Sequence, residues 1–600
     1  MVRMIDRKAK SKRLRDTPEV WRHYAVLTVF VGLVVGMGVR VAYLTVSERE
    51  FLQKQGDARS VRAEEIPAMR GVIYDRQGKA LAVSTPVFAV WTDPSRANLK
   101  DEQVKRLAQA LKVDEQKLAQ RIARQKSGQF AYLERRIDYA QAQAVKALEI
   151  EHIYLQPEYR RFYPAGETTA HVVGVTNIDD TGIEGSERAY DQQLRGVPGG
   201  KVVLKDRLGN TIRDLEYLGA PAYGQDAMLS IDLRLQYLAY KELKSAVVSH
   251  DAKSASIVML DVKNAEVLAL VNQPSYNPNN IKDHLGGMRN RAITDTYEPG
   301  STVKPFTALA ALESGRYQRS SSINTAPGYF RVGDKLIQDP INRGQITLDQ
   351  AIQKSSQVAI AKVALDLDQE AVFDVLQRAG FGEYVGLGLG GESVGFLSAA
   401  QLRYPVVRTS MSFGYGLSAT PLQLARAYLT LASYGEKRQV SILKRSHETG
   451  AQRVFDRRIV ADVISMMELV TTAQGTAPGA AIPGFKVAGK TGTARIVGPD
   501  GYDDERHVAW FAGMVPVRDP RLVVVVLVNE PKAGLSGGGA VAAPVFARVA
   551  AQSLHLLGVA PDDNNSLHAQ SENQAEKLLA GSQVLLKQAK YPTPSLGVSG

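Results

Sequence analysis

The sequence predicts an α+β protein that is attached to a membrane by one N-terminal helix. The apolar stretch over residues 24–46 would span about 34 Å as a helix, which is enough to cross a bilayer. Two apolar runs between residues 255 and 271 flank a turn at Lys263-Asn264-Ala265, as paired antiparallel strands do. Good helix formers follow over residues 301–313 and 348–366. Together these three observations indicate the α+β class.

Composition narrows the classes of function. The 600 residues include no Cys, which excludes disulfides and Cys-ligated metals. The nine His have no metal-ligand spacing, so we expect neither a metal site nor a cofactor. The net charge of +12 at pH 7 suits an anionic membrane surface or anionic wall polymers. Nucleic acid would also suit that charge, but the sequence contains no helix-turn-helix, zinc-ligand or aromatic-basic RNA motif.

The N-terminal region predicts an uncleaved membrane anchor. Residues 1–23 carry eight Lys or Arg and precede the apolar residues 24–46, so we expect the first segment in the cytoplasm. A cleaved signal peptide is the alternative, but Tyr43-Leu44-Thr45-Val46 does not offer the small residues of a cleavage site. Gly32 and Gly36 form a Gly-x-x-x-Gly pair, which indicates either a helix–helix contact or only a glycine-containing span.

The rest of the chain divides into two domains and a tail. Residues 47–225 contain a strand-turn-strand pattern over 70–82 and helical patterns over 101–148, but no catalytic constellation. We therefore expect a spacer or interaction module there. A second domain is expected over residues 226–560, which contain the paired strands described above. Residues 561–600 are polar and aperiodic, which predicts a disordered tail.

Ser301 and Lys304 have the spacing of a nucleophile and its base. Pro299 and Gly300 end the preceding segment and helix formers follow, so Ser301 is expected beside a helix N-terminus. Residues three apart share one face of a helix, and the positive helix end favours a neutral amine and a developing alkoxide. A Ser beside a base is an activated nucleophile. Ser-x-x-Lys also occurs by chance, in which case it is a capped helix with a solvated Lys.

Two further motifs separate these interpretations. Ser355-Ser356-Gln357 opens another helical pattern, and Lys490-Thr491-Gly492-Thr493 heads a predicted strand. Ser-x-x-Lys, Ser-x-Asn and Lys-Thr-Gly in this order are the signature of penicillin-binding proteins and serine β-lactamases. The chain departs from this signature at Gln357, where the signature has Asn.

With these motifs in place, the chain resembles the class B penicillin-binding proteins, and most of all their division-specific, FtsI-type members. The resemblance extends from the apolar helix to about residue 558. Besides the three motifs it rests on residues 70–82, 161–164, 182–191, 272–279, 413–416 and 420–424. It implies that residues 47–225 form an elongated, mixed α/β pedestal of the dimerisation type. It also implies that residues 226–560 form a transpeptidase domain, with an antiparallel sheet between helical layers.

The resemblance implies a serine-type peptidoglycan D,D-transpeptidase, which cross-links stem peptides in septal wall synthesis during cell division. Ser301 would attack the carbonyl between two D-alanines, Lys304 would take its proton, and Ser355 would relay a proton to the leaving amine. Lys490 completes the catalytic set. As a second cation it would, together with the helix end, lower the pKa of Lys304. β-Lactams would be trapped covalently at Ser301.

The resemblance also implies a set of substrate contacts. Lys490 and Thr491 would bind the terminal carboxylate, and Gly492 would leave room for the substrate along the strand edge. The N–H group of Thr493 and that of the nucleophile would form the oxyanion hole. Gln357 would offer its amide to the substrate, displaced by one methylene from the amide of Asn, so we expect an active but atypical enzyme.

Location and partners follow from the same resemblance. The protein would cross the bacterial inner membrane once, with its catalytic domain in the periplasm. It would pair with a division glycosyltransferase of the FtsW type and with other divisome proteins. Three alternatives stay open: an elongation-type transpeptidase, a catalytically weakened divisome scaffold, and a β-lactamase. A β-lactamase also needs a carboxylate-held water for deacylation, and no Glu-x-x-Leu-Asn motif follows Ser355.

Overall fold

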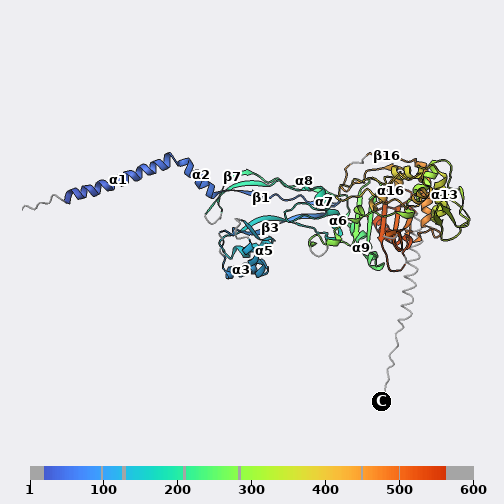
Figure 1. The fold of residues 1–600 in the computed structure, drawn as a ribbon, viewed down its shortest axis with the longest axis horizontal. Coiled ribbons are helices and arrows are strands. Elements are labelled where there is room, and N and C mark those ends of the chain that lie inside the picture. The colour runs from blue at the N-terminus through green and yellow to red at the C-terminus, as the bar shows by residue number, and fades with distance from the viewer. Residues whose placement is uncertain are drawn as a thin grey trace, which may run out of the picture. The chain divides into compact units, whose positions relative to one another are not determined.

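A computed structural model describes residues 19–562 apart from 96, 98, 125–129, 207–210, 282–284, 447–449, 499–500 and 535 (Figure 1). The predicted cytoplasmic tail lies outside the described residues as far as residue 18. The predicted disordered tail lies outside them from residue 563 onward.

The first helix is long and apolar enough to cross a membrane. α1 (Glu19–Val46) contains the whole of the predicted span. A Cβ added to Gly32 or Gly36 would meet no atom within 4 Å, so this face of the helix is open. α2 (Arg49–Ser60) follows after a short break.

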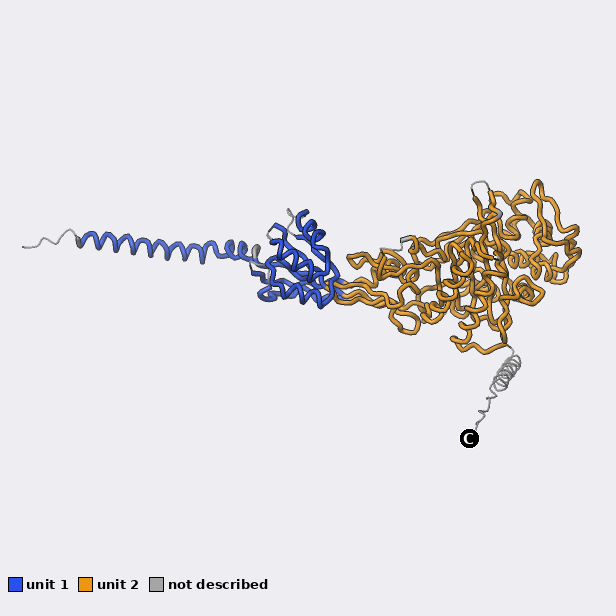
Figure 2. The backbone as a smooth tube through the Cα atoms, turned by 90° about the horizontal axis from the view of Figure 1, so that it is seen from below, with its two compact units in different colours: residues 1–68, 88–157, 197–222 blue, residues 69–87, 158–196, 223–600 orange. Residues whose placement is uncertain are grey.

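The chain forms two compact units that interleave along the sequence (Figure 2). The first unit comprises residues 1–68, 88–157 and 197–222, and the second comprises residues 69–87, 158–196 and 223–600. Neither unit is therefore one continuous stretch of sequence.

The first unit combines two sheets with helices. One sheet is antiparallel and contains β1 (Val61–Ile66), β6 (Gly199–Lys205) and β7 (Thr211–Gly219). In the other, the end of β3 (Ala80–Thr92) pairs with β4 (Ala131–Ile137), and β5 (Ile153–Phe162) pairs with β3. Besides α1 and α2, the unit contains the helices α3 (Asp101–Leu111), α4 (Glu115–Arg124) and α5 (Tyr139–Lys146).

A strand inside residues 101–148 corrects the sequence-based expectation of helices alone. β4 alternates between buried Ala131 and Leu133 and the more exposed Tyr132 and Glu134, which is the period of a strand. Leu133 joins the apolar core beneath α3 and α5. The compositional bias towards helix formers hid this period of two.

The part of the second unit that precedes its large sheet in the sequence consists of short strands and helices. β2 (Ile73–Tyr74) pairs with β3, which confirms the strand-turn-strand pattern predicted over residues 70–82. The others are β8 (Ala227–Met228), α6 (Ala170–Val173), α7 (Gly185–Ala189) and α8 (Asp191–Leu194).

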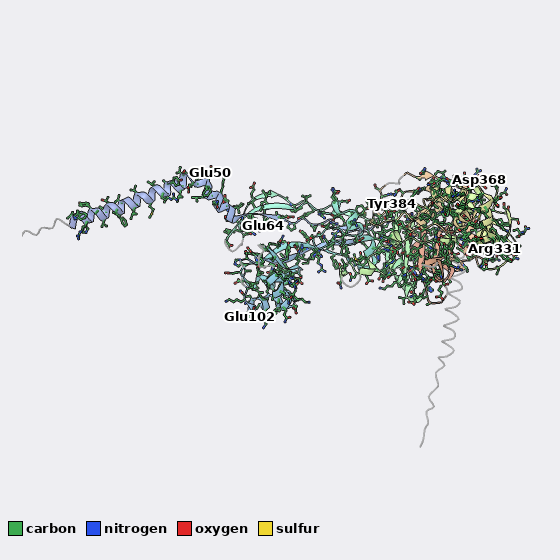
Figure 3. All side chains as sticks on the ribbon, viewed as in Figure 1. Glu50, Glu64, Glu102, Arg331, Asp368 and Tyr384 are labelled. Atoms are coloured by element: carbon green, nitrogen blue, oxygen red, sulfur yellow. The ribbon has the colours of Figure 1, made fainter. Side chains whose placement is uncertain are left out.

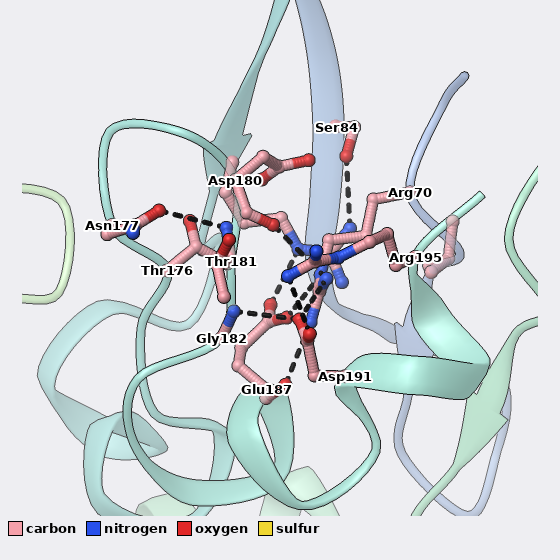
Figure 4. A network of polar contacts seen from close by, with 12 residues as sticks. Arg70, Ser84, Thr176, Asn177, Asp180, Thr181, Gly182, Glu187, Asp191 and Arg195 are labelled. Atoms are coloured by element: carbon pink, nitrogen blue, oxygen red, sulfur yellow. Dashed lines mark hydrogen bonds and ion pairs between the residues drawn. The ribbon is translucent and has the colours of Figure 1, made fainter. Parts of the chain in front are cut away.

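A buried ion-pair network ties these elements together (Figure 4). The Nε atoms of Arg70 and Arg161 lie 2.7 Å and 2.6 Å from the carboxylate of Glu187. The Nη1 atom of Arg70 also lies 2.7 Å from Asp191. Arg70 and Glu187 are 1% and 0% exposed. Each buried charge therefore contacts an opposite charge, as the burial of ions requires.

A five-stranded antiparallel sheet forms the centre of the second unit and confirms the pairing predicted for residues 255–271. The strand order is β10 (Val267–Gln273), β9 (Ser254–Asp261), β19 (Leu522–Asn529), β18 (Gly501–Val515) and β17 (Ala488–Gly498). β17 is consequently an edge strand. The helices packed on this sheet include α9 (Leu233–Ser249), α16 (Pro421–Ala432) and α18 (Gly538–Leu556).

Neighbouring residues of β17 face different helical layers. A Cβ on Gly539, in α18, would lie 3.6 Å from Thr491. A Cβ on Gly492 would instead lie 2.7 Å from the carbonyl oxygen of Pro299. Because successive strand residues point to opposite faces, the sheet lies between helical layers.

The remaining elements of the second unit are short helices and hairpins. They are α10 (Arg291–Thr294), η4 (Gly300–Val303), α11 (Lys304–Glu313), β11 (Ser322–Asn324), β12 (Tyr329–Val332), β13 (Lys335–Gln338), β14 (Gln345–Thr347), α12 (Leu348–Gln353), α13 (Gln357–Asp366), α14 (Ala371–Arg378), α15 (Pro405–Ser412), β15 (Glu436–Lys437), β16 (Gln452–Arg453) and α17 (Arg457–Glu468). The single helix predicted over residues 348–366 is two helices, because Ser355 adopts a φ of 57° between them.

Candidate active site

Ser301 lies in the 3₁₀ turn η4, directly before α11, which confirms its predicted position beside a helix N-terminus. Two contacts from distant segments hold this turn. The N–H of Gly300 donates to the carbonyl of Gly414 (3.1 Å), and the hydroxyl of Tyr428 donates to the carbonyl of Thr302 (2.8 Å). The backbone around the nucleophile is therefore fixed from outside its own helix.

Lys304 and Lys490 meet at Ser355. The Nζ of Lys304 donates to the Ser355 carbonyl (2.6 Å) and lies 3.1 Å from its Oγ. The Nζ of Lys490 lies 2.9 Å from the same Oγ. The three side chains come from α11, β17 and the turn between α12 and α13. The structure thus brings together one residue from each predicted motif.

Both lysines are fully buried, in contrast with exposed charged residues such as Glu102, Arg331 and Asp368 (Figure 3). The pKa of Lys304 is lowered to about 7, mainly by burial; the carboxylate of Asp339 opposes this shift and the charge of Arg343 adds to it. Burial and the charge of Lys304 also hold the pKa of Lys490 well below its usual value. The pKa of Lys304 is lowered as expected, but the cause differs: burial has the largest effect, and neither Lys490 nor the helix end, which the sequence suggested, is among the causes.

Asp339 is a site residue that sequence reasoning missed. Its buried carboxylate accepts hydrogen bonds from the Ser356 hydroxyl (2.5 Å) and the Gln357 N–H (2.6 Å). Ser356 in turn caps α13 through the N–H of Ala359. Asp339 therefore anchors the start of α13, immediately after Ser355. No local pattern could identify it, because it acts from a loop 17 residues before Ser356.

The Lys-Thr-Gly motif lies on the free edge of the sheet. Lys490, Thr491, Gly492 and Thr493 pair with β18 on one side only. An edge strand of this kind can accept a further extended segment. The Thr491 hydroxyl lies 3.1 Å from that of Thr476, and the hydroxyl of the exposed Thr493 accepts the N–H of Gly538 (3.1 Å).

Gly492 has a packing role that the sequence did not reveal. A Cβ at this position would lie 2.7 Å from the carbonyl oxygen of Pro299 and 2.8 Å from the methyl group of Thr302. Only glycine therefore lets β17 approach the turn that carries Ser301. Gln357 is the first residue of α13 and is half-buried.

Glu298, three residues before Ser301, accepts hydrogen bonds from residues of two other segments. Its Oε1 accepts hydrogen bonds from the Gly416 N–H (2.8 Å) and the Tyr502 hydroxyl (3.0 Å). The ring of Tyr502 lies 5.5 Å from that of Tyr415. Burial raises the pKa of the Glu298 carboxyl above its usual value. The sequence singled out the stretch around Tyr415 only as family-like text.

This arrangement can perform acyl transfer. A hydroxyl lies at a helix N-terminus, an amine with a pKa of about 7 lies one turn later, and that amine contacts a second hydroxyl. A base whose pKa is near the working pH transfers protons efficiently.

Comparison of the chain with known protein families and individual proteins agrees with the three motifs. Residues 255–551 match the penicillin-binding protein transpeptidase domain, and residues 65–229 match the penicillin-binding protein dimerisation domain. The peptidoglycan D,D-transpeptidase FtsI of Escherichia coli K12 is 43% identical over 529 residues, which cover 87% of this chain and 90% of that protein. The probable peptidoglycan D,D-transpeptidase PbpC of Pseudomonas aeruginosa is 37% identical over 555 residues, which cover 92% of this chain and 98% of that protein.

A solved structure matches more than half of the chain. The TP domain of penicillin-binding protein 3 from Burkholderia pseudomallei is 37% identical at a TM-score of 0.52, and the match covers 56% of this chain and 98% of that one. The fold class and the family expected from the three motifs are confirmed. The chain therefore belongs to the FtsI-type peptidoglycan D,D-transpeptidases of the penicillin-binding protein family.

Proposed function

We propose that this protein cross-links peptidoglycan stem peptides through an acyl-enzyme on Ser301, in the septal wall at cell division. The observation that carries the mechanism is the Oγ of Ser355, held at 3.1 Å and 2.9 Å from two buried lysines. The membership of the chain in the FtsI-type family supports the septal role.

The first step is the attack of Ser301. Neutral Lys304 accepts the hydroxyl proton, and the Ser301 oxygen adds to the carbonyl between the two terminal D-alanines of a stem peptide. The backbone N–H groups of Ser301 and Thr493 stabilise the negative oxygen that forms, and each such donor contributes about 3–4 kcal/mol in comparable sites.

The second step breaks the bond to the last D-alanine. The C–N bond cleaves, and the leaving nitrogen receives a proton through Ser355, whose hydroxyl is replenished from Lys304. An amine of a neighbouring stem peptide then attacks the ester and loses its proton along the same path. Ser301 departs and regains a proton, which restores the enzyme.

Substrate binding is assigned to the edge of β17. Lys490 and Thr491 bind the terminal carboxylate, and Gln357 offers its side-chain amide to the substrate. The stem peptide extends along the free edge of the strand past Gly492 and Thr493, in the manner of an added strand.

The apolar helix α1 anchors the enzyme in the bacterial inner membrane. We assign the N-terminus to the cytoplasm and the catalytic domain to the periplasm, because basic residues precede the helix. Gly32 and Gly36 form an open face on which a membrane partner, a division glycosyltransferase of the FtsW type, can pack closely. Replacing both glycines by Leu is expected to weaken co-purification with that partner while the protein stays in the membrane. Unchanged co-purification would contradict this assignment.

Covalent labelling by a fluorescent penicillin tests the proposed reaction. The full-length protein is expected to be labelled, and Ser301→Ala is expected to abolish the label without lowering thermal stability. Ser320→Ala, at an exposed serine in the same unit, is the matched control and should label normally. No labelling of the natural chain would indicate a non-catalytic scaffold, and labelling at another serine would exclude Ser301 as the nucleophile.

A further inference from the structure

The first unit contains a cavity of about 900 Å³ that the proposed reaction does not use. All of its lining residues belong to this unit, and they come from the helix α5, the strands β1, β3, β5, β6 and β7, and the loops beside them. The volume is in the range of small-molecule sites. The cavity is therefore a candidate binding site in a region to which the sequence assigned no chemistry.

Aromatic side chains form one part of the cavity wall. The ring of Trp91 lies 4.9 Å from that of Phe130 and 4.4 Å from that of Tyr154, at interplanar angles of 31° and 32°. Phe88 contributes a fourth ring. The side chain of Phe130 is 49% exposed, although apolar rings are usually covered. These rings offer flat, apolar faces to a ligand.

Neutral polar side chains form another part of the wall. Gln143 and Gln156 each carry an amide, which can donate and accept hydrogen bonds. The Nδ1 of His152 lies 3.4 Å from the hydroxyl of Tyr154, so a second donor and acceptor pair lies beside the rings. A ligand that combines flat apolar faces with hydroxyl and amide groups would satisfy both parts of the wall.

The charges of the wall restrict the ligand further. The lining includes four glutamates and two lysines, which is an excess of negative charge in a chain whose net charge is +12. Glu64 of β1 lies 2.8 Å from Lys205, so this lysine is already paired (Figure 3). Like charges facing each other oppose binding. The cavity therefore disfavours nucleic acid, anionic lipid headgroups and acidic peptides.

We propose that this cavity binds the sugar chain of the wall polymer whose stem peptides the enzyme cross-links. The identity of the polymer rests on the proposed function. The C–H face of a sugar ring is flat and apolar and stacks on an aromatic ring, while hydroxyl and acetamido groups bond to the amides. A cationic peptide would suit the glutamates but would leave the neutral polar groups unused. Holding the polymer on the same chain as Ser301 would raise its effective concentration there.

Titration of the full-length protein in detergent with the hexamer of N-acetylglucosamine tests the proposal. This probe carries sugar rings and acetamido groups but no stem peptide, and calorimetry should show saturable binding. Phe130→Ala should weaken the affinity about two- to tenfold, the effect of one aromatic contact. Tyr217→Ala is the matched control, because it removes an exposed ring of the same unit outside the cavity and should bind normally. Maltohexaose, which has no acetamido groups, should bind more weakly.

A second variant and a second ligand separate the outcomes. If Phe130→Ala lowered the thermal unfolding temperature, Gln143→Ala would decide, because it changes an exposed helical residue to a good helix former. No saturable binding, or equal affinities of all these variants, would overturn the proposal. Displacement of the hexamer by tighter-binding hexalysine would instead assign the cavity to a cationic peptide. Absence of penicillin labelling would contradict the proposed function but not the sugar binding, which is measured without catalysis.

Discussion

Two buried charged clusters in the second unit have opposite electrostatics. In the first, Arg70 and Arg161 contact the carboxylate of Glu187 at 2.7 Å and 2.6 Å. In the second, Lys304 and Lys490 converge on a hydroxyl at 3.1 Å and 2.9 Å, and no ion pair to a described carboxylate is formed by either amine.

The difference in counter-charge produces opposite pKa shifts. Burial acts to lower the pKa of Arg70, but Glu187 and Asp191 outweigh it, so that the pKa is raised. For Lys304 burial prevails, and the pKa falls to about 7. A compensated cluster stays charged and holds segments together, whereas an uncompensated one supplies a neutral base. The same physical effect, burial, thus serves structure in one place and chemistry in the other.

Replacing the proposed base, Lys304, should have the largest effect on the acylation rate. Lys304→Met keeps the length of the side chain but cannot accept a proton, so the penicillin acylation rate should fall by about 10²–10⁴-fold. Thermal stability should be equal or higher, because a buried amine without a counter-charge is replaced by an apolar group. Stopped-flow acylation and thermal unfolding measure the two quantities. A near-normal rate would show that another group takes the proton.

Removing the shared carboxylate should break the compensated cluster. Glu187→Gln leaves two buried arginines without their common counter-charge, and the free energy of unfolding should fall by about 3–5 kcal/mol. The folded fraction should still acylate at the normal rate. Lys244→Gln is the control, because it breaks an exposed pair with Glu167 and should change stability by about 1 kcal/mol or less. Equal losses from both substitutions, measured by chemical denaturation, would contradict the comparison.

The pH dependence of acylation should report the pKa of Lys304. Only its neutral form accepts a proton, so the rate should be at a plateau above pH 7 and should fall about tenfold per unit below it. Asp339 raises this pKa, while Arg343 lowers it. Asp339→Asn should therefore move the midpoint to lower pH. A midpoint that stays in place, or moves upward, would assign the titration to a different group.

The smallest effect is expected at Gln357. Its backbone N–H is fixed by Asp339 at 2.6 Å, so the extra methylene displaces the side-chain amide rather than the chain. Gln357→Asn should change β-lactam acylation rates by about tenfold or less, with a shift in selectivity, because Ser355 and both lysines are unaltered. Identical rates for several β-lactams would make Gln357 a neutral replacement.

The three motifs could be recognised in the sequence because each of them is a short continuous stretch of residues. Helix formers after Gly300 predicted the N-terminal position of Ser301, and apolar runs predicted the antiparallel strands. The apolar span and the helix α1 coincide for the same reason, since length and composition are properties of one continuous segment. The strand β4 was missed where composition favoured helix and hid the alternation of buried and exposed residues.

The other features of the site and of the fold depend on contacts between residues that are far apart in the sequence. The sequence by itself determined the family, the nucleophile candidate and the anchor, because these depend on residue types at fixed spacing. Tertiary structure alone decided that Lys490 meets Ser355 across 135 residues, that Asp339 anchors α13, and that Glu187 lies between two arginines. It also decided the pKa of Lys304, because burial depends on which distant segments surround a side chain and no local pattern records them.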